Sequence, residues 1–126
     1  MLRCVTLAAA IFAASLPAAA QVQRNFPANA LRGEIRFLQP PEALLNGKPA
    51  RLSPGARIRN PSNMIQLSGS LLGQKLAVHY TLDPAGELRD VWILSEAELA
   101  KKPWPATPEQ AQTWVFDSTM QRWSKP

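Results

Sequence analysis

The chain has 126 residues, of which 46% are hydrophobic and 18% are charged, and its formal net charge is +5. This length suits one domain, and this apolar fraction disfavours a disordered, collagen-like or coiled-coil chain. The single cysteine, Cys4, excludes an intrachain disulfide framework. We therefore expect one small globular domain.

The first twenty residues have the pattern of a secretory signal peptide. Arg3 provides a positive charge, an apolar stretch follows over residues 5–16, and three alanines end at Ala20. The apolar stretch is shorter than the roughly 20 residues that a membrane-spanning helix needs. We predict cleavage after Ala20, which would remove Cys4 and place the mature chain in the periplasm or outside the cell.

The mature chain divides into two parts. Residues 21–30 are expected to be disordered or extended, and residues 31–126 to form a single β-rich domain. Eleven of the twelve prolines follow residue 20, and such a density favours short strands and rigid turns over long helices. Without cysteine and with only one histidine, the mature chain lacks the ligands of a zinc or thiol site, so we expect no metal and no cofactor.

The first half of the domain is predicted to consist of short strands. Alternating apolar and polar residues indicate a strand over Leu31–Phe37. Asn46-Gly47 between two short apolar runs is the strongest hairpin signal in the chain. The other elements expected in this half are a turn at 53–55, a strand at 57–59 with Ile58 inward, a strand at 64–68, and a loop at 69–73 whose Leu71 and Leu72 cover the end of the core.

A second hairpin is predicted from Lys75 to Leu94. Asp83-Pro84-Ala85-Gly86 fits a type I turn followed by a glycine in the left-handed conformation. Pairing Leu82 with Leu88 keeps one face apolar, whereas a shift by one residue would bury charge. Continued without irregularity, this register pairs Tyr80 with Asp90, Val78 with Trp92 and Leu76 with Leu94, and it sets His79 opposite Val91 on the polar face.

The C-terminal part begins with two short helices. Ser95 and Glu98 form a capping box for a helix that ends before Pro103, and Thr107-Pro108 begins a second helix of about two turns. Bulky and β-branched residues at 114–116 and 120–123 indicate two last strands. Six or seven short strands with one or two short C-terminal helices predict a mainly β protein, folded as a small barrel or a curled antiparallel sheet.

Several turn-and-strand motifs carry a resemblance to known proteins. They are Leu31-x-Gly33-x-Ile35, Leu44-Leu45-Asn46-Gly47-Lys48, Arg51-Leu52-x-x-Gly55-Ala56-Arg57-Ile58, and the Val78-His79-Tyr80-Thr81 hairpin that ends in Trp92-Ile93-Leu94. Residues 31–94 resemble uncharacterised small exported proteins of Gram-negative bacteria. The first half also resembles oligonucleotide/oligosaccharide-binding-like (OB-like) barrel domains of unknown function. The resemblance implies a small extracytoplasmic β domain and brings no catalytic residue.

The positive charge is concentrated in the first half of the mature chain. Residues 21–75 carry eight basic and two acidic side chains, whereas residues 76–126 carry five basic and seven acidic ones. Such asymmetry can indicate an anion-binding face, and a solvated outer sheet face is the alternative. Suitable ligands are an anionic envelope lipid or glycan, or an acidic envelope protein, while nucleic acid is disfavoured. The candidate anion-binding residues are Arg32, Arg36, Arg51, Arg57 and Arg59.

Two further residues attract attention as site candidates. Trp104, held between two prolines, is a candidate surface aromatic, with packing under the short helices as the alternative. His79 has no serine and carboxylate arranged around it in the predicted register, and no G-x-S-x-G motif or phosphate-binding loop is present. We therefore expect a protein that is not an enzyme.

The sequence leaves two functions open. The first is a periplasmic or secreted binding module with a basic face for anionic envelope ligands. The second is a structural or chaperone-like accessory that docks to an envelope protein complex through an exposed strand edge. Arginines gathered on one face would favour the first function, and dispersed arginines beside a bare apolar edge would favour the second.

Overall fold

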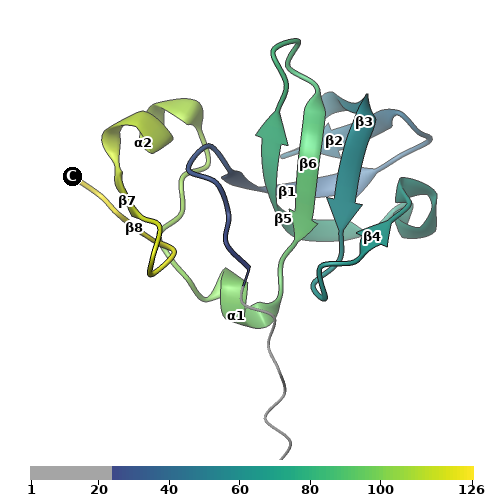
Figure 1. Cartoon of the computed structure of the whole chain (residues 1–126). Helices are drawn as coiled ribbons and strands as arrows, with labels where there is room; N and C mark the ends of the chain where they lie inside the picture. The colour runs from purple at the N-terminus through teal and green to yellow at the C-terminus, as the bar shows by residue number, and fades with distance from the viewer. Residues whose placement is uncertain (1–23) are drawn as a thin grey trace, which may run out of the picture.

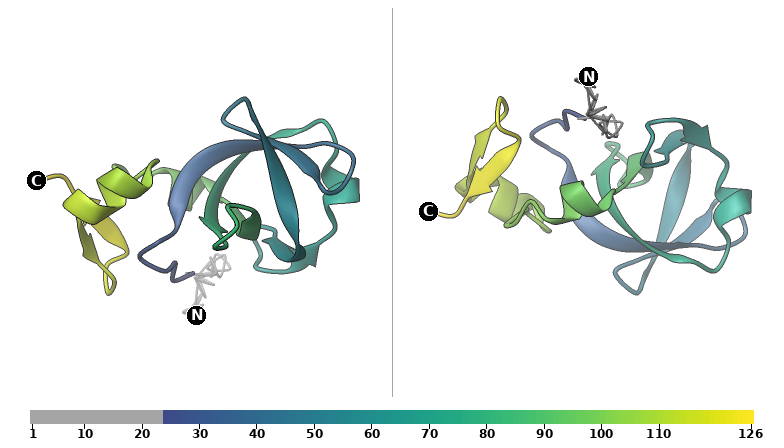
Figure 2. Two further views of the ribbon diagram at one scale, coloured as in Figure 1. Left: turned by 90° about the horizontal axis from the view of Figure 1, so that it is seen from above. Right: turned by 90° about the horizontal axis from the view of Figure 1, so that it is seen from below.

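The computed structural model describes residues 24–126, so the predicted signal peptide lies outside the described residues. The described chain is mainly β and consists of a closed barrel with a smaller C-terminal lobe beside it (Figures 1 and 2). No helix among the described residues is both long and apolar enough to cross a membrane.

The barrel is closed by five strands. They follow the order β2-β1-β5-β6-β3, and pairing between β2 and β3 closes the ring. All neighbours are antiparallel except β3 and β6, which are parallel. The barrel strands are β1 (Leu31–Phe37), β2 (Glu42–Leu45), β3 (Lys48–Arg59), β5 (Lys75–Leu82) and β6 (Leu88–Ile93).

The core of the barrel is formed by the inward-facing residues of these strands. Strand β1 alternates as predicted, and Ile35 and Phe37 are fully buried together with Val78, Leu88 and Val91. The strand β4 (Ile65–Gln66) pairs with β3 outside the closed ring, and the 3-10 helix η1 (Ser68–Leu71) places Leu71 in the core. The expected strand at 64–68 is thus shorter than predicted, and Leu72 is exposed.

The first predicted hairpin is confirmed, but the turn predicted at residues 53–55 is wrong. Asn46 and Gly47 have φ angles of 53° and 80°, as a two-residue hairpin turn requires. Strand β3 continues through Ser53-Pro54-Gly55, because its first half pairs with β2 and its second half with β4 and β6. The irregular pairing between Leu52 and Arg57 lets proline and glycine stay within a strand that changes partners.

The predicted register of the second hairpin is correct next to the turn and wrong further along the strands. Leu82 pairs with Leu88 as predicted, but a β-bulge follows on β6. The extra residue, Arg89, shifts the ladder so that Val78 faces Ile93 and no longer Trp92. The bulge turns the apolar Val91 and Ile93 inward and moves Asp90 and Trp92 to the outside of the barrel, because side chains alternate along a strand.

The turn of this hairpin provides a test of its conformation. The N–H of Gly86 donates to the Asp83 carbonyl at 2.9 Å, and Gly86 has a φ angle of 81°. We expect Gly86→Val to lower the free energy of unfolding by about 1 to 2 kcal/mol, because a β-branched residue is strained at positive φ. Pro84→Ala should cost under about 1 kcal/mol, because proline there mainly restricts the unfolded chain. Urea denaturation measures both, and equal losses would contradict the assigned turn.

The C-terminal lobe contains α1 (Glu96–Leu99), α2 (Pro108–Thr113), β7 (Val115–Asp117) and β8 (Arg122–Ser124). Both helices begin as predicted. Ser95 and Glu98 form the capping box, and Thr107 caps α2 with Pro108 at the first helical position. The lobe has its own apolar cluster, whose buried members are Phe26, Ala30, Leu94, Trp104 and Trp123.

The segment before the barrel is part of this lobe. Arg24, Phe26 and Ala30 are buried, and the N–H of Phe26 donates to the side-chain carbonyl of Gln121 at 2.8 Å. Residues 24–30, which we expected to be disordered or extended, are thus packed against the lobe and the barrel. The hydrogen bonds that hold this segment join residues between 36 and 95 positions apart, which no local pattern reveals.

Candidate functional site

A buried polar cluster lies where the C-terminal lobe covers the outer face of the barrel. His79 on β5 is 1% exposed and stacks on Trp104, with ring centroids 4.1 Å apart. Arg32 on β1 donates from Nε to Nε2 of His79 at 3.2 Å, so neutral His79 carries its proton on Nδ1. Burial, with the positive charges of Arg32 and Arg24, lowers the pKa of His79 to about 2. His79, which we expected to be solvated, is thus a buried neutral side chain.

The same cluster holds Arg32, which we expected to bind anions. Its Nη1 and Nη2 donate to the backbone carbonyls of Lys101 and Glu98 at 3.0 and 2.9 Å. These carbonyls lie at the C-terminal end of α1 and just beyond it, and the Glu98 carbonyl also accepts from the backbone N–H of Lys101 at 3.2 Å. Arg32 therefore joins the lobe to the barrel and is not available to an external anion, which corrects its assignment as an anion-binding residue.

A buried ion pair completes the cluster. Arg24 donates from Nε to Glu98 Oε2 at 2.9 Å, and its Nη2 and Nη1 donate to the carbonyls of Ile93 and Asn60 at 2.7 and 2.9 Å. Burial alone would raise the pKa of the Glu98 carboxyl, but hydrogen bonds from Arg24 and Ser95 and the charge of Arg24 outweigh it and lower this pKa below its ordinary value. The pair connects the N-terminal segment, the barrel and α1.

Trp104 is part of this buried cluster and not a surface aromatic. The side chain is 7% exposed, and its Nε1 donates to the Ala30 carbonyl at 3.0 Å. The flanking Pro105 accepts a hydrogen bond from the backbone N–H of Arg32 at 2.8 Å, which draws this stretch onto the barrel. The prediction of an exposed Trp104 was therefore wrong, because a proline-bounded aromatic can also cover another surface of its own chain.

The other candidate arginines are dispersed. Arg36 on β1 stands opposite Lys75, whereas the remaining three lie on β3, which is not a neighbour of β1 in the barrel. Arg51 forms an exposed ion pair with Glu42 at 3.7 Å, and Arg59 contacts Asp90 at 3.4 Å. The structure thus does not gather the five arginines into one anion site.

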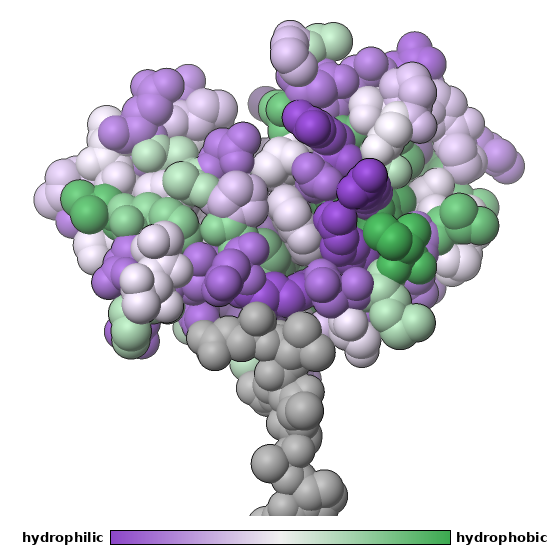
Figure 3. Space-filling view, in the orientation of Figure 1, coloured by the Kyte–Doolittle hydropathy of each residue, from purple (hydrophilic) through white to green (hydrophobic). Residues whose placement is uncertain are grey.

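An exposed apolar edge lies on the far side of the barrel from the lobe. We call the residues Met64, Ile65 and Leu67 the β4 edge. Their side chains are between 61% and 79% exposed, and β4 ends the strand order of the described sheet. Figure 3 shows apolar side chains gathered over β4 and the neighbouring 3-10 helix. Monomeric proteins rarely leave grouped large apolar side chains this exposed without a partner.

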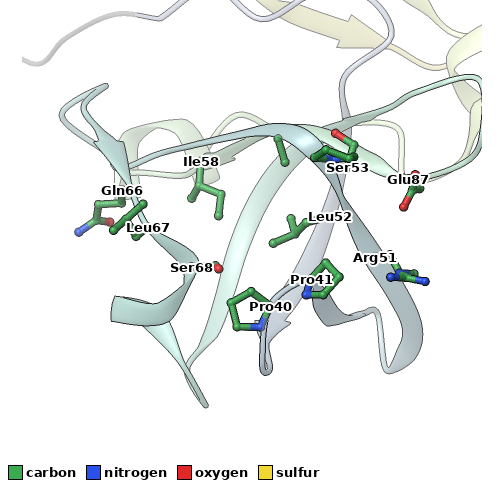
Figure 4. A pocket seen from close by; sticks show the side chains of 12 residues that line it. Pro40, Pro41, Arg51, Leu52, Ser53, Ile58, Gln66, Leu67, Ser68 and Glu87 are labelled. Carbon is green, nitrogen blue, oxygen red and sulfur yellow. The ribbon is translucent and has the colours of Figure 1, made fainter.

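A groove of about 480 Å³ adjoins the β4 edge. Leu52 and Ile58 point into it from β3, as Figure 4 shows. Pro40-Pro41 borders it opposite the segment 66–68, and Arg51 and Glu87 lie at its other end. Its size falls within the usual range of roughly 300 to 1,000 Å³ for binding sites. The groove and the β4 edge together offer apolar side chains next to an unextended sheet.

Our sequence interpretation missed this surface. Residues 64–68 were assigned to an ordinary strand, although no acidic residue lies between Glu42 and Asp83. That long stretch has no carboxylate and contains three large apolar residues close together, Met64, Ile65 and Leu67, and this combination is the signal that could have identified the surface. No such signal exists for Arg24 and Glu98, which are 74 positions apart.

Among residues 24–126, no three side chains of His, Cys, Asp and Glu are arranged to hold a metal ion. Comparisons with protein-family models, with curated proteins and with solved structures found no significant match.

Proposed function

We propose that this chain is an exported, non-enzymatic interaction module that docks a partner protein at the β4 edge. The observation that carries the proposal is the exposure of Met64, Ile65 and Leu67 beside the groove, at a sheet edge that no strand of residues 24–126 extends. Burying exposed apolar side chains yields about 25 cal/mol per Å². A partner that covers this surface therefore gains free energy that the isolated chain leaves unused.

Two features of the barrel support this reading over the anion-binding module. Arg32 is engaged with backbone carbonyls, and the other arginines do not form one face. Dispersed arginines beside an apolar edge are the arrangement that favours docking.

We keep the OB-like similarity as part of the proposal, because a closed five-stranded barrel is compatible with it.

Photocrosslinking in cells that export the chain tests the docking function. A benzophenone amino acid in place of Leu67 should give one discrete crosslinked protein, and adding Ile65→Glu should abolish the adduct. The matched control is the same replacement of Val115, which is 67% exposed on the C-terminal lobe and should give no such adduct. Equal adducts at both positions, or none at Leu67, would refute the proposal.

Export itself is tested by the mature N-terminus. Because small residues at Ala18-Ala19-Ala20 follow an apolar stretch of export length, the processed chain should begin at Gln21. Intact-mass spectrometry of the exported protein measures this directly. A mass that includes Met1, or a lipid attached to Cys4, would contradict the assigned signal peptide.

A further inference from the structure

We infer that the occupant of the β4 edge is an extended segment of a partner protein, with alternating acidic and apolar residues, that adds to β4 as a further strand. This inference rests on the docking function proposed above. It follows from three properties of the β4 edge: free backbone groups, an apolar groove on one face, and basic side chains on the other.

The backbone of β4 offers one free donor and one free acceptor. The N–H of Asn60 donates to the Met64 carbonyl at 2.8 Å, which makes these two residues a hydrogen-bonded pair. Hydrogen-bonded and non-hydrogen-bonded pairs alternate along an antiparallel ladder, so the next pair, Arg59 with Ile65, is a non-hydrogen-bonded one. The N–H and C=O of Ile65 therefore point away from β3. An extended chain can bond to both groups, as in other cases of strand addition.

The two faces of β4 differ in chemistry. Gln66 pairs with Ile58, and both line the groove, so the alternate side chains of an added strand would lie on this apolar side. Ile65 pairs with Arg59 on the opposite face, where the remaining side chains of the added strand would project. Because β4 is short and its backbone can supply few bonds, side chains on both faces must contribute to the affinity.

The charge around the β4 edge selects an acidic segment. The stretch without acidic residues carries only positive charge, and within the described chain Arg57 forms no ion pair. An added strand would lie two strand spacings, about 10 Å, from β3. That distance is close to the Debye length of about 8 Å, so Arg57, unlike Arg59 with its Asp90 partner, would still attract carboxylates. The basic residues of this stretch are Lys48, Arg51, Arg57, Arg59 and Lys75.

The same charge argues against a second copy of this chain as the occupant. Two β4 strands paired across a two-fold axis would set the two β3 strands three strand spacings, about 14 Å, apart, with positive charge facing positive charge. Such a pairing gains no electrostatic attraction, and whatever charge interaction salt leaves unscreened is repulsive. A partner segment with carboxylates on its outward face gains an attraction that a second copy lacks.

Fluorescence-anisotropy titration of the full mature chain with three labelled octapeptides tests the inference. The first peptide alternates valine and glutamate, the second alternates valine and lysine, and the third is the first with its valine nitrogens methylated. We expect the acidic peptide to bind, and the lysine and methylated peptides to bind at least ten-fold more weakly. Binding of the acidic peptide should also weaken as salt is raised. No binding of the acidic peptide, or equal binding of all three, would overturn the inference.

Matched variants locate the bound strand. Ile65→Pro removes the outward N–H without removing a donor to β3, so it should weaken binding of the acidic peptide at least ten-fold. Ile65→Thr keeps that N–H and should weaken binding less. Arg57→Gln should weaken binding of the acidic peptide several-fold, whereas Arg122→Gln on β8 should not change it. If Ile65→Pro does not fold, the methylated peptide reports the same bond on the unaltered protein. Crosslinking at Leu67 without these peptide effects would refute strand addition and leave the docking function standing; absence of both would refute both.

Discussion

Replacing Arg24 with alanine is expected to lower the free energy of unfolding by about 3 to 5 kcal/mol, because it leaves the Glu98 carboxylate buried without its partner. The side chains of Arg24 and Glu98 are only 4% and 12% exposed, so water compensates little for the lost contacts. The carbonyls of Ile93 and Asn60 lose a charged donor at the same time. Chemical denaturation of the purified mature chain measures the loss.

The chain provides a matched control for this prediction. Arg51 also pairs with a glutamate, Glu42, but the two side chains are 61% and 52% exposed and 3.7 Å apart. Exposed pairs contribute about 0 to 1 kcal/mol, so Arg51→Ala should change stability by no more than that. Arg24→Lys tests the geometry, because a lysine keeps the charge but cannot donate to three partners from a planar fork. Similar losses for Arg24→Ala and Arg51→Ala would show that burial does not strengthen the pair.

The protein should lose about 2 to 3 kcal/mol of stability between pH 7 and pH 4.5 through His79 alone. The pKa of His79 is about 2 in the folded chain and 6.5 in the unfolded chain, so only the unfolded chain takes up a proton in this range. Each proton taken up by the unfolded chain alone favours unfolding as the pH falls, by up to about 1.4 kcal/mol per pH unit below 6.5. Glu98, whose pKa is lowered, adds its own loss only below about pH 4.5.

Denaturation curves of the wild type and of His79→Gln over this pH range separate the effect from general acid sensitivity. Glutamine does not titrate, and its carbonyl oxygen can accept the hydrogen bond that Arg32 gives to His79. The variant loses part of the stacking on Trp104 and should be less stable at pH 7. Its stability should nevertheless stay nearly constant down to pH 4.5. A slope equal to that of the wild type would show that His79 is not the group that senses acid.

These two predictions concern residues that the sequence interpretation either missed or misplaced. His79 was expected to be solvated because it lies on the outer face of β5; it does lie on that face, but Trp104 of the C-terminal lobe covers it. On β6, one extra residue exchanged the faces of the residues beyond it relative to the predicted register. A bulge of this kind is decided by which side chains fill the barrel, so its position was not available from the hairpin pattern alone.

The sequence by itself determined the local features of this protein: the strand at Leu31–Phe37, both hairpin turns, and the capping of both helices. Each depends on residues within a few positions of one another, whose backbone preferences act over that range. Only the tertiary structure decided which strands close the barrel, how Arg24 and Glu98 meet, and that Trp104 is buried while Leu67 is exposed. These outcomes depend on which distant segments compete to cover the same apolar surface. The lobe covers the barrel over His79, and no described segment covers the β4 edge.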